Sequence, residues 1–321
     1  MRSDRVDQSI LDSVGNTALI ELRTAVPTDA GRVLVKLETS NPTGSMKDRM
    51  ALAMIEAAEN DGRLQPGGTV VEYTGGSTGV SLAQVCACKG YALHIVTSDA
   101  FSAEKRQHMR ALGADLTVIP SNDGAMDEAL TRSMIDTAAA ITAETGGLWT
   151  DQLNNRDQVA GYKAMGEEIW RQTGGSLDAF VQSVGTAGSI VGNARALQEH
   201  DPGIEVVAVE PAESAVLSGE RGGAHRIEGI GAGFVVPLWD PQLVDAVLTY
   251  STEEAMQMTR RLARDEGIFA GTSTGANVLG AVATARRLGP DSTVVTVACD
   301  SGIKYLSTDL YESTSKSRSP S

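Results

Sequence analysis

The segment NPTGSMKDRM, residues 41–50, carries a single lysine, Lys47, directly after a run of turn-forming residues. Asn, Pro, Gly and Ser all favour tight turns. The run RVLVKLE (32–38) before the segment is apolar and β-branched, and MALAMIEAAEND (50–61) after it has helical periodicity. The sequence therefore predicts a strand, a turn and a helix, with Lys47 just ahead of the helix.

The same succession of strand and helix continues along the chain. Apolar runs at 69–73, 92–98, 115–119, 177–184, 204–210 and 292–299 alternate with helical patterns at 80–90, 102–114, 189–200 and 275–289. Such alternation implies right-handed crossovers and mainly parallel sheets, which define an α/β fold. A further helix is signalled by Ser251, with Glu254 three residues later and Gly267 at its end.

Two series of these units predict two α/β domains with mainly parallel twisted sheets. We place the smaller domain at residues 40–150 and the larger domain at residues 1–39 together with 151–310. Residues 311–321 are rich in serine and lack apolar periodicity, so they are expected to form a disordered tail.

Composition and charge restrict the kind of partner. The formal net charge is -14 and no basic cluster is present. We therefore expect a small-molecule partner and neither nucleic acid nor membrane. No run resembles a secretory signal or reaches the ~18 apolar residues of a spanning helix, which favours a cytoplasmic protein. The cysteines and histidines lack the spacing of a disulfide framework or a metal site, so no metal is expected.

Three Gly/Ser/Thr-rich loops each lie between a predicted strand and a helical pattern: TGGSTG (74–79), GTAGS (185–189) and GTSTGAN (271–277). One such loop would be an ordinary strand-to-helix turn, but three of them point to a shared ligand. Glycines let main-chain N–H groups converge, and the following helix adds unpaired donors and a positive dipole end. GTAGS fits a phosphate-binding loop, with the Thr186 and Ser189 hydroxyls as extra donors.

A dinucleotide site is the strongest alternative for this loop. Gly185, Gly188 and Gly192 follow a predicted strand, and Glu210 ends the next strand, where a ribose-binding acid would lie. The spacing differs from G-x-G-x-x-G, so the match is loose.

Lys47 can be interpreted in two ways. A lysine with a pKa near ~10.4 is a protonated surface residue in most proteins. Burial would lower that pKa and give an amine that forms an imine with a carbonyl group. A carbonyl cofactor that also carries a phosphate would join Lys47 and the 185–189 loop in one site. Pyridoxal 5'-phosphate is such a cofactor.

These residues resemble the pyridoxal-phosphate enzymes of the tryptophan synthase β fold, in particular the cysteine synthase (O-acetylserine sulfhydrylase) and cystathionine β-synthase group. The likeness extends from VGNTALIELR (14–23) to SGIKYLST (301–308). The resemblance implies that Lys47 is the catalytic lysine and forms the imine with the cofactor. It also implies that Ser273 faces the pyridine nitrogen. The implied phosphate loop consists of Gly185, Thr186, Ala187, Gly188 and Ser189.

The resemblance also implies a substrate-carboxylate site. Its residues are Thr74, Gly75, Gly76, Ser77 and Thr78, with Gln152 beside the carboxylate and Gly229 in the segment GIGAG that lines the active site. Two of these residues depart from the family pattern. Ser77 replaces an asparagine that contacts the cofactor's phenolic oxygen, and Gly75 replaces a serine. Both departures fall where a subgroup with another leaving group or nucleophile would differ.

The implied activity is β-elimination or β-replacement on an activated L-serine or on cysteine. Cysteine synthase, which makes cysteine from O-acetylserine and sulfide in cysteine biosynthesis, comes first. A cysteine desulfhydrase or a synthase of another β-substituted alanine comes next, and a serine or threonine dehydratase last. Alternatives from other classes are a nicotinamide-dependent oxidoreductase and a non-catalytic regulatory binding protein. The resemblance also implies a homodimer.

Overall fold

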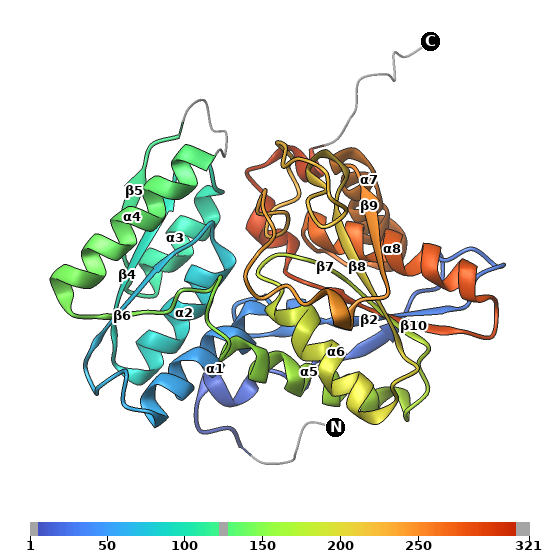
Figure 1. Cartoon of the computed structure of the whole chain (residues 1–321), viewed down its shortest axis with the longest axis horizontal. Coiled ribbons are helices and arrows are strands. Elements are labelled where there is room, and N and C mark those ends of the chain that lie inside the picture. The colour runs from blue at the N-terminus through green and yellow to red at the C-terminus, as the bar shows by residue number, and fades with distance from the viewer. Residues whose placement is uncertain (1–5, 122–127, 313–321) are drawn as a thin grey trace, which may run out of the picture.

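The computed structural model describes residues 6–121 and 128–312. Figure 1 shows two lobes, each built on one β-sheet. The strand order is β1-β2-β10-β7-β8-β9 in the six-stranded sheet and β5-β4-β3-β6 in the four-stranded sheet. All neighbouring strands run parallel except β1 and β2. The predicted α/β fold with mainly parallel sheets is confirmed.

The six-stranded sheet has helices on both faces. Its strands are β1 (Leu19–Glu21), β2 (Arg32–Leu37), β7 (Ala179–Ser183), β8 (Glu205–Pro211), β9 (Ala246–Tyr250) and β10 (Thr293–Ala298), and its helices are α5 (Gln158–Thr173), α6 (Gly188–His200), α7 (Thr252–Arg261) and α8 (Thr272–Leu288). Successive side chains of a strand point to opposite faces. Phe180 accordingly packs in one core with residues of α5 and α6, and Val181 packs in another with residues of α7 and α8.

The four-stranded sheet is covered in the same way. Its strands are β3 (Thr69–Tyr73), β4 (Ala92–Ser98), β5 (Asp115–Ile119) and β6 (Leu148–Trp149), and its helices are α1 (Lys47–Asn60), α2 (Ser77–Lys89), α3 (Ala103–Ala111) and α4 (Glu128–Thr145). Val70 of β3 packs with residues of α1 and α2, whereas Val71 packs with α4. Helix α1 also contacts α5 of the other lobe.

Short helical turns complete the chain: η1 (Ile10–Ser13), η2 (Glu38–Ser40), η3 (Ala212–Ser214), η4 (Pro241–Leu243), the π-helical η5 (Leu262–Glu266), η6 (Gly302–Tyr305) and η7 (Asp309–Tyr311). Ser251 caps α7, and its hydroxyl accepts a hydrogen bond from the Glu254 N–H, as predicted. Gly267, with φ +71°, ends η5 rather than α7 itself. Within residues 6–121 and 128–312, no helix is long and apolar enough to cross a membrane.

The strands divide between the sheets by chain segment, because β1, β2 and β7 to β10 form one sheet and β3 to β6 the other. The domain boundaries at 40 and 150 stay a prediction. Tyr311, placed in the predicted tail, belongs to η7, and its hydroxyl donates to the Ala270 carbonyl at 2.6 Å. Residues 313–321 of that tail lie outside the described residues.

Candidate active site

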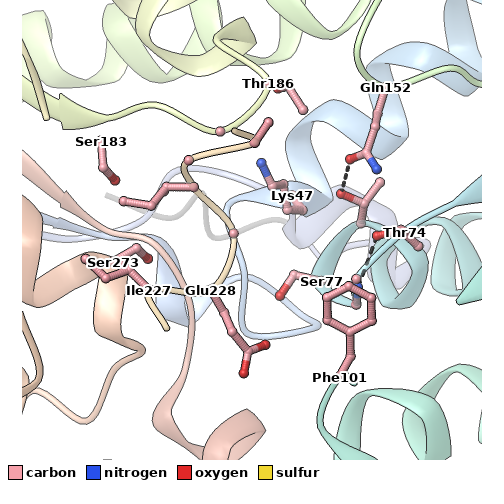
Figure 2. Close-up of a pocket in the computed structure, with 18 of the residues that line it drawn as sticks. Lys47, Thr74, Ser77, Phe101, Gln152, Ser183, Thr186, Ile227, Glu228 and Ser273 are labelled. Carbon is pink, nitrogen blue, oxygen red and sulfur yellow. Dashed lines mark hydrogen bonds between the residues drawn. The ribbon is translucent and has the colours of Figure 1, made fainter. Parts of the chain in front are cut away.

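A cavity of about 1050 Å³ is lined by segments of both lobes. Figure 2 shows residues of its wall, with Lys47 pointing into the space between them. Of the predicted site residues, the following line the cavity: Lys47, Thr74, Gly75, Gly76, Ser77, Thr78, Gln152, Gly185, Thr186, Ala187, Ser189, Gly229 and Ser273. Gly188 does not line it. A Cβ on Gly188 would lie 2.3 Å from Gln158 Oε1, so this glycine permits close packing of α6 against α5.

The topology explains why these segments meet. The carboxyl ends of parallel strands lie at one edge of a sheet, and the loops that follow them form ligand sites. The 74–76 loop follows β3 and leads into α2, and the 184–187 loop follows β7 and leads into α6. Residues 299–301 follow β10, and the start of α8 lies beside them, since the Gly271 N–H donates to the Asp300 carbonyl at 3.0 Å.

Lys47 is the first residue of α1 and its side chain is half-buried. Burial lowers the pKa of its ammonium group below the ordinary value, and the nearby Asp300 carboxylate opposes this effect. The segment before it is fixed, because the Met46 N–H donates to the Cys299 carbonyl at 2.8 Å. A lysine amine in this setting is neutral at a lower pH than a surface lysine, which suits it to bond to a carbonyl carbon.

A buried ion network holds α1 in place, and spacing in the sequence did not reveal it. The Arg49 guanidinium donates to Glu38 at 2.7 Å and to Glu168 of α5 at 2.8 Å. The Lys36 ammonium of β2 donates to the same Glu168 at 2.6 Å. All four side chains are less than one-tenth exposed. The network fixes the helix whose first residue is Lys47 to both β2 and α5.

Asp48 fixes the turn before α1 to α2. Its carboxylate accepts from the Thr43 N–H at 2.8 Å, from the Thr43 hydroxyl and from the Ser81 hydroxyl at 2.6 Å. Burial raises the pKa of Asp48, and these donors oppose that effect. The segment KDR therefore contains one cavity residue, Lys47, followed by two residues that hold the surrounding elements.

The 184–187 loop has the backbone geometry of an anion site. Ala187 has φ +66°, in the left-handed region, and α6 begins directly after it. A Cβ on Gly185 would lie 2.4 Å from the Gly229 carbonyl oxygen, so only glycine permits this close approach. The first N–H groups of α6 have no acceptor within their own helix. The loop and helix start therefore suit a phosphate group.

The hydroxyls expected as extra phosphate donors are used elsewhere in this conformation. The Thr186 hydroxyl donates to Gln158 Oε1 at 2.7 Å, and the Ser189 hydroxyl donates to Gln182 Oε1 at 2.9 Å. Each hydroxyl has a single O–H group. Main-chain N–H groups are thus the donors that remain for a phosphate.

Ser273 lies in the first turn of α8 on the cavity wall, next to Cys299. Burial and the Asp300 carboxylate raise the pKa of the Cys299 thiol to about 12, and hydrogen bonding from Ser273 opposes this effect. The thiol is therefore protonated at neutral pH. No pattern in the sequence indicated that Cys299 would line the cavity.

The 74–78 loop and Gln152 form one hydrogen-bonded unit. The Thr78 hydroxyl donates to Gln152 Oε1 at 2.7 Å, and Gln152 Nε2 donates to the Tyr73 carbonyl at 3.0 Å. The Thr74 hydroxyl accepts from the Gly76 N–H at 3.1 Å. Figure 2 marks one hydrogen bond at Thr74 and one at Gln152 with dashed lines. Gly76 has φ +148°, which favours glycine, and α2 starts directly after it.

The two departures from the family pattern have structural partners. The Ser77 hydroxyl donates to Asp300 Oδ2 at 3.0 Å, and the Tyr305 hydroxyl donates to the same oxygen at 2.7 Å. A Cβ on Gly75 would lie 2.5 Å from the Phe101 ring, which lines the cavity. Asp300 and Phe101 are far from these loops in sequence, so spacing could not identify them.

An ion pair joins the two lobes at the cavity. Lys105 of α3 donates to Glu228 at 2.5 Å, and its ammonium lies 4.4 Å from the centroid of the Tyr305 ring. All three residues line the cavity. Sequence reasoning missed this pair as well, because single charges in a helix and a loop are ordinary surface features. Among the described residues, no group of three or more His, Cys, Asp or Glu side chains could hold a metal ion.

The residues of the dinucleotide alternative have other roles. The buried Glu210 carboxylate accepts from the Leu217 N–H at 2.8 Å and from the Ser218 N–H and hydroxyl at 2.9 and 2.6 Å. A Cβ on Gly192 would lie 2.7 Å from Tyr162 Cβ, so this glycine serves helix packing. Neither Glu210 nor Gly192 belongs to the cavity wall.

Comparisons with a family model, with curated relatives and with solved structures all match most of the chain. The family model described as "Pyridoxal-phosphate dependent enzyme" matches residues 10–300. A cysteine synthase of Staphylococcus aureus is 41% identical over 305 residues, covering 94% of this chain and 96% of the relative. The crystal structure of O-ureido-L-serine synthase has a TM-score of 0.91 at 34% identity and covers 98% of both chains. That of the cysteine synthase of Entamoeba histolytica has a TM-score of 0.90 at 34% identity, covering 99% of this chain and 94% of the other.

Proposed function

The chain belongs to the pyridoxal-phosphate-dependent enzyme family, and we propose that it is a cysteine synthase, which replaces the acetoxy group on Cβ of O-acetyl-L-serine with sulfide and releases acetate. Family membership confirms the predicted fold, cofactor and enzyme class. The observation that carries the proposal is the placement of Lys47. Its amine, with a lowered pKa, faces a cavity to which all three glycine-rich loops contribute.

The residues around the cavity fit pyridoxal phosphate. Lys47 Nζ would be the attachment point, and the 185–189 loop with the start of α6 would hold the phosphate through main-chain N–H groups. Ser273, on the cavity wall, would offer a neutral hydroxyl to the ring nitrogen. The bound cofactor withdraws electrons from the substrate Cα, which makes the Cα proton acidic and allows the β substituent to leave.

Substrate recognition is assigned to the other lobe. The start of α2 provides N–H donors for the amino acid's carboxylate, the Thr74 hydroxyl is a further donor, and the Thr78 hydroxyl is held by Gln152. Lys47, whose amine faces the cavity with a lowered pKa, would remove the Cα proton as general base. The lobes around the cavity exclude water from the reacting Cβ.

The two departures in the 74–78 loop favour a second candidate, a synthase of another β-substituted alanine. The Phe101 ring occupies the space beside Gly75, and Ser77 is engaged with Asp300. Both features change the surface that meets the leaving group and the nucleophile. O-ureido-L-serine synthase, one of the structural relatives, is named for a product of this kind. A cysteine desulfhydrase, which eliminates the β substituent of cysteine, is the third candidate.

The experiment is a substrate screen with the purified holoenzyme. O-Acetyl-L-serine and other activated serines are each supplied with sulfide or another small nucleophile, and products are identified by mass spectrometry. We expect cysteine from O-acetyl-L-serine and sulfide, with turnover abolished in Lys47→Ala. Lys163→Ala is the matched control, because Lys163 is exposed and pairs with Glu199 on the surface. Full turnover in Lys47→Ala would refute the proposal.

We further propose a homodimer and a cytoplasmic location, which rest on the family resemblance and on the sequence. Light scattering of the purified holoenzyme tests the first, and fractionation of the source cells tests the second. A monomer at micromolar concentration would contradict the dimer.

A further inference from the structure

Glu72 is a buried acid directly beneath the 74–78 loop. It is the fourth residue of β3 and is fully buried. Its Oε2 accepts from the Thr150 hydroxyl at 2.7 Å and from the Gln152 N–H at 3.0 Å. Its Oε1 accepts from the Tyr73 N–H at 2.9 Å. Within the described residues, no lysine or arginine forms an ion pair with it. Burying a carboxylate without an ion-pair partner costs free energy. The hydrogen bonds from Thr150, Gln152 and Tyr73 offset part of that cost and fix these three residues to Glu72.

The turn that Glu72 spans is in an uncommon backbone conformation. Asp151, between Thr150 and Gln152, has φ +46°, a left-handed value that is unfavourable for a residue other than glycine. Glu72 Oε2 accepts hydrogen bonds from the residues on both sides of Asp151. The carboxylate therefore stabilises the turn from within the fold.

This turn determines where Gln152 points. The Gln152 side chain accepts from the Thr78 hydroxyl at the start of α2 and donates to the Tyr73 carbonyl. Figure 2 shows Gln152 with a dashed line that marks one of its hydrogen bonds. Gln152 and Thr78 line the cavity, whereas Glu72 does not. Any influence of Glu72 on a bound substrate is therefore indirect, through Gln152 or through Tyr73, whose N–H it also accepts from.

We propose that Glu72 is a positioning residue for the substrate's carboxylate: it holds the left-handed turn at Asp151 so that Gln152 presents Thr78 and the start of α2 to the amino acid. The inference rests on the proposed function, because it assumes that the 74–78 loop binds an amino-acid carboxylate. It predicts an effect on substrate binding larger than the effect on the chemical step.

The charge state of Glu72 adds a pH dependence. Burial raises the pKa of Glu72 to about 7, against the Thr150 hydroxyl and the N–H groups of Gln152 and Tyr73, and the nearby Asp151 raises it further. The titratable groups that interact electrostatically with Glu72 are the Asp151 carboxylate and the Tyr73 hydroxyl. All three hydrogen-bond partners are donors, so a protonated Glu72 can no longer accept fully from each. Substrate binding should therefore weaken as the pH falls through about 7.

The test compares Glu72→Gln with Glu210→Gln in the holoenzyme. Glu210 is the matched control, because it is also buried, also accepts three hydrogen bonds and does not line the cavity. KM and kcat for O-acetyl-L-serine are measured from about pH 6 to pH 9. Glu72→Gln should raise KM about tenfold, as expected for the loss of a hydrogen bond to a charged group. Its kcat should stay within about threefold of the wild type.

The pH profiles give the second readout. The wild-type KM should rise below about pH 7, and this rise should be absent in Glu72→Gln and present in Glu210→Gln. An unchanged KM in Glu72→Gln, or equal effects of the two variants, would overturn the inference. If Glu72→Gln does not fold, the wild type alone still provides a test. A wild-type KM that stays constant from pH 6 to pH 8 would then overturn the inference.

Failure of the proposed function is distinguishable from failure of this inference. If the wild type turns over no activated serine, the reaction assignment is wrong. The dissociation constant of O-acetyl-L-serine, read from the cofactor's absorption spectrum, then replaces KM in the same comparison. An equal dissociation constant in Glu72→Gln and wild type would overturn the positioning role.

Discussion

Replacing Glu168 with glutamine tests the buried ion network behind Lys47. The Glu168 carboxylate accepts from Arg49 at 2.8 and 2.9 Å, from Lys36 at 2.6 Å and from the Asn16 N–H at 2.9 Å. Glutamine keeps the size of the side chain but removes the negative charge. Lys36 and Arg49 would then share Glu38 as the remaining anion of the network.

The magnitude follows from the carboxyl group's pKa. Burial alone would raise the pKa of Glu168, but Arg49 and Lys36 outweigh it and lower the pKa from an ordinary 4.5 to about 2. At about 1.4 kcal/mol for each tenfold change, this stabilises the folded state by about 3 kcal/mol at neutral pH. Removing one partner of a buried ion pair costs about 3–5 kcal/mol. We therefore expect Glu168→Gln to lower the free energy of unfolding by about 3–5 kcal/mol.

Urea unfolding at pH 7 measures this loss, with Glu199→Gln as the matched control. Glu199 accepts from Lys163 at 2.6 Å but is 58% exposed, so its loss should cost at most about 1 kcal/mol. Equal losses in the two variants would refute the account of the network.

The same pair of variants predicts a pH effect. Since the pKa of Glu168 is depressed in the folded state, its contribution is present above about pH 4.5 and is lost as the pH falls towards about 2. In Glu168→Gln this part of the acid sensitivity should be missing. A wild type and variant with the same dependence of unfolding free energy on pH would contradict the predicted direction.

Three further predictions concern the cavity. Gly185→Ala places a Cβ 2.4 Å from the Gly229 carbonyl oxygen, so the loop must shift and the cofactor dissociation constant should rise at least about tenfold, measured by equilibrium dialysis. Gly75→Ala pushes the Phe101 ring into the cavity and should raise KM about tenfold, and a second change, Phe101→Ala, should reverse part of this rise. Because burial lowers the pKa of Lys47, trace acetylation of the cofactor-free protein should reach half-maximum for Lys47 at a lower pH than for the average lysine. Unchanged values in any of these assays would contradict the corresponding contact.

Local patterns in the sequence were sufficient for the α/β fold and for the three glycine-rich loops of the cavity wall. Short apolar, β-branched runs and glycine-rich turns are short-range signals, and parallel sheets bring the loops after their strands to one edge. The capping pair Ser251 and Glu254 is equally local. The two-residue strand Leu148–Trp149 carries no such signal, because its pairing with β3 depends on the sheet already being formed.

Contacts between distant parts of the chain could not be read from spacing. Arg49 and Glu168 are 119 residues apart, and Ser77 and Asp300 are 223 residues apart. Gly188 shows another limit, since its motif predicts the phosphate loop, whereas the structure shows that a Cβ there would lie 2.3 Å from Gln158 Oε1. A glycine that permits helix packing and one that permits ligand approach look the same in sequence.

The most direct test of the account is to locate the cofactor's covalent attachment. The holoenzyme is reduced with borohydride, digested and analysed by mass spectrometry. The account predicts one modified residue, Lys47, in the peptide that contains NPTGSM. Modification of Lys105, the other lysine on the cavity wall, or the absence of any modified lysine would contradict it.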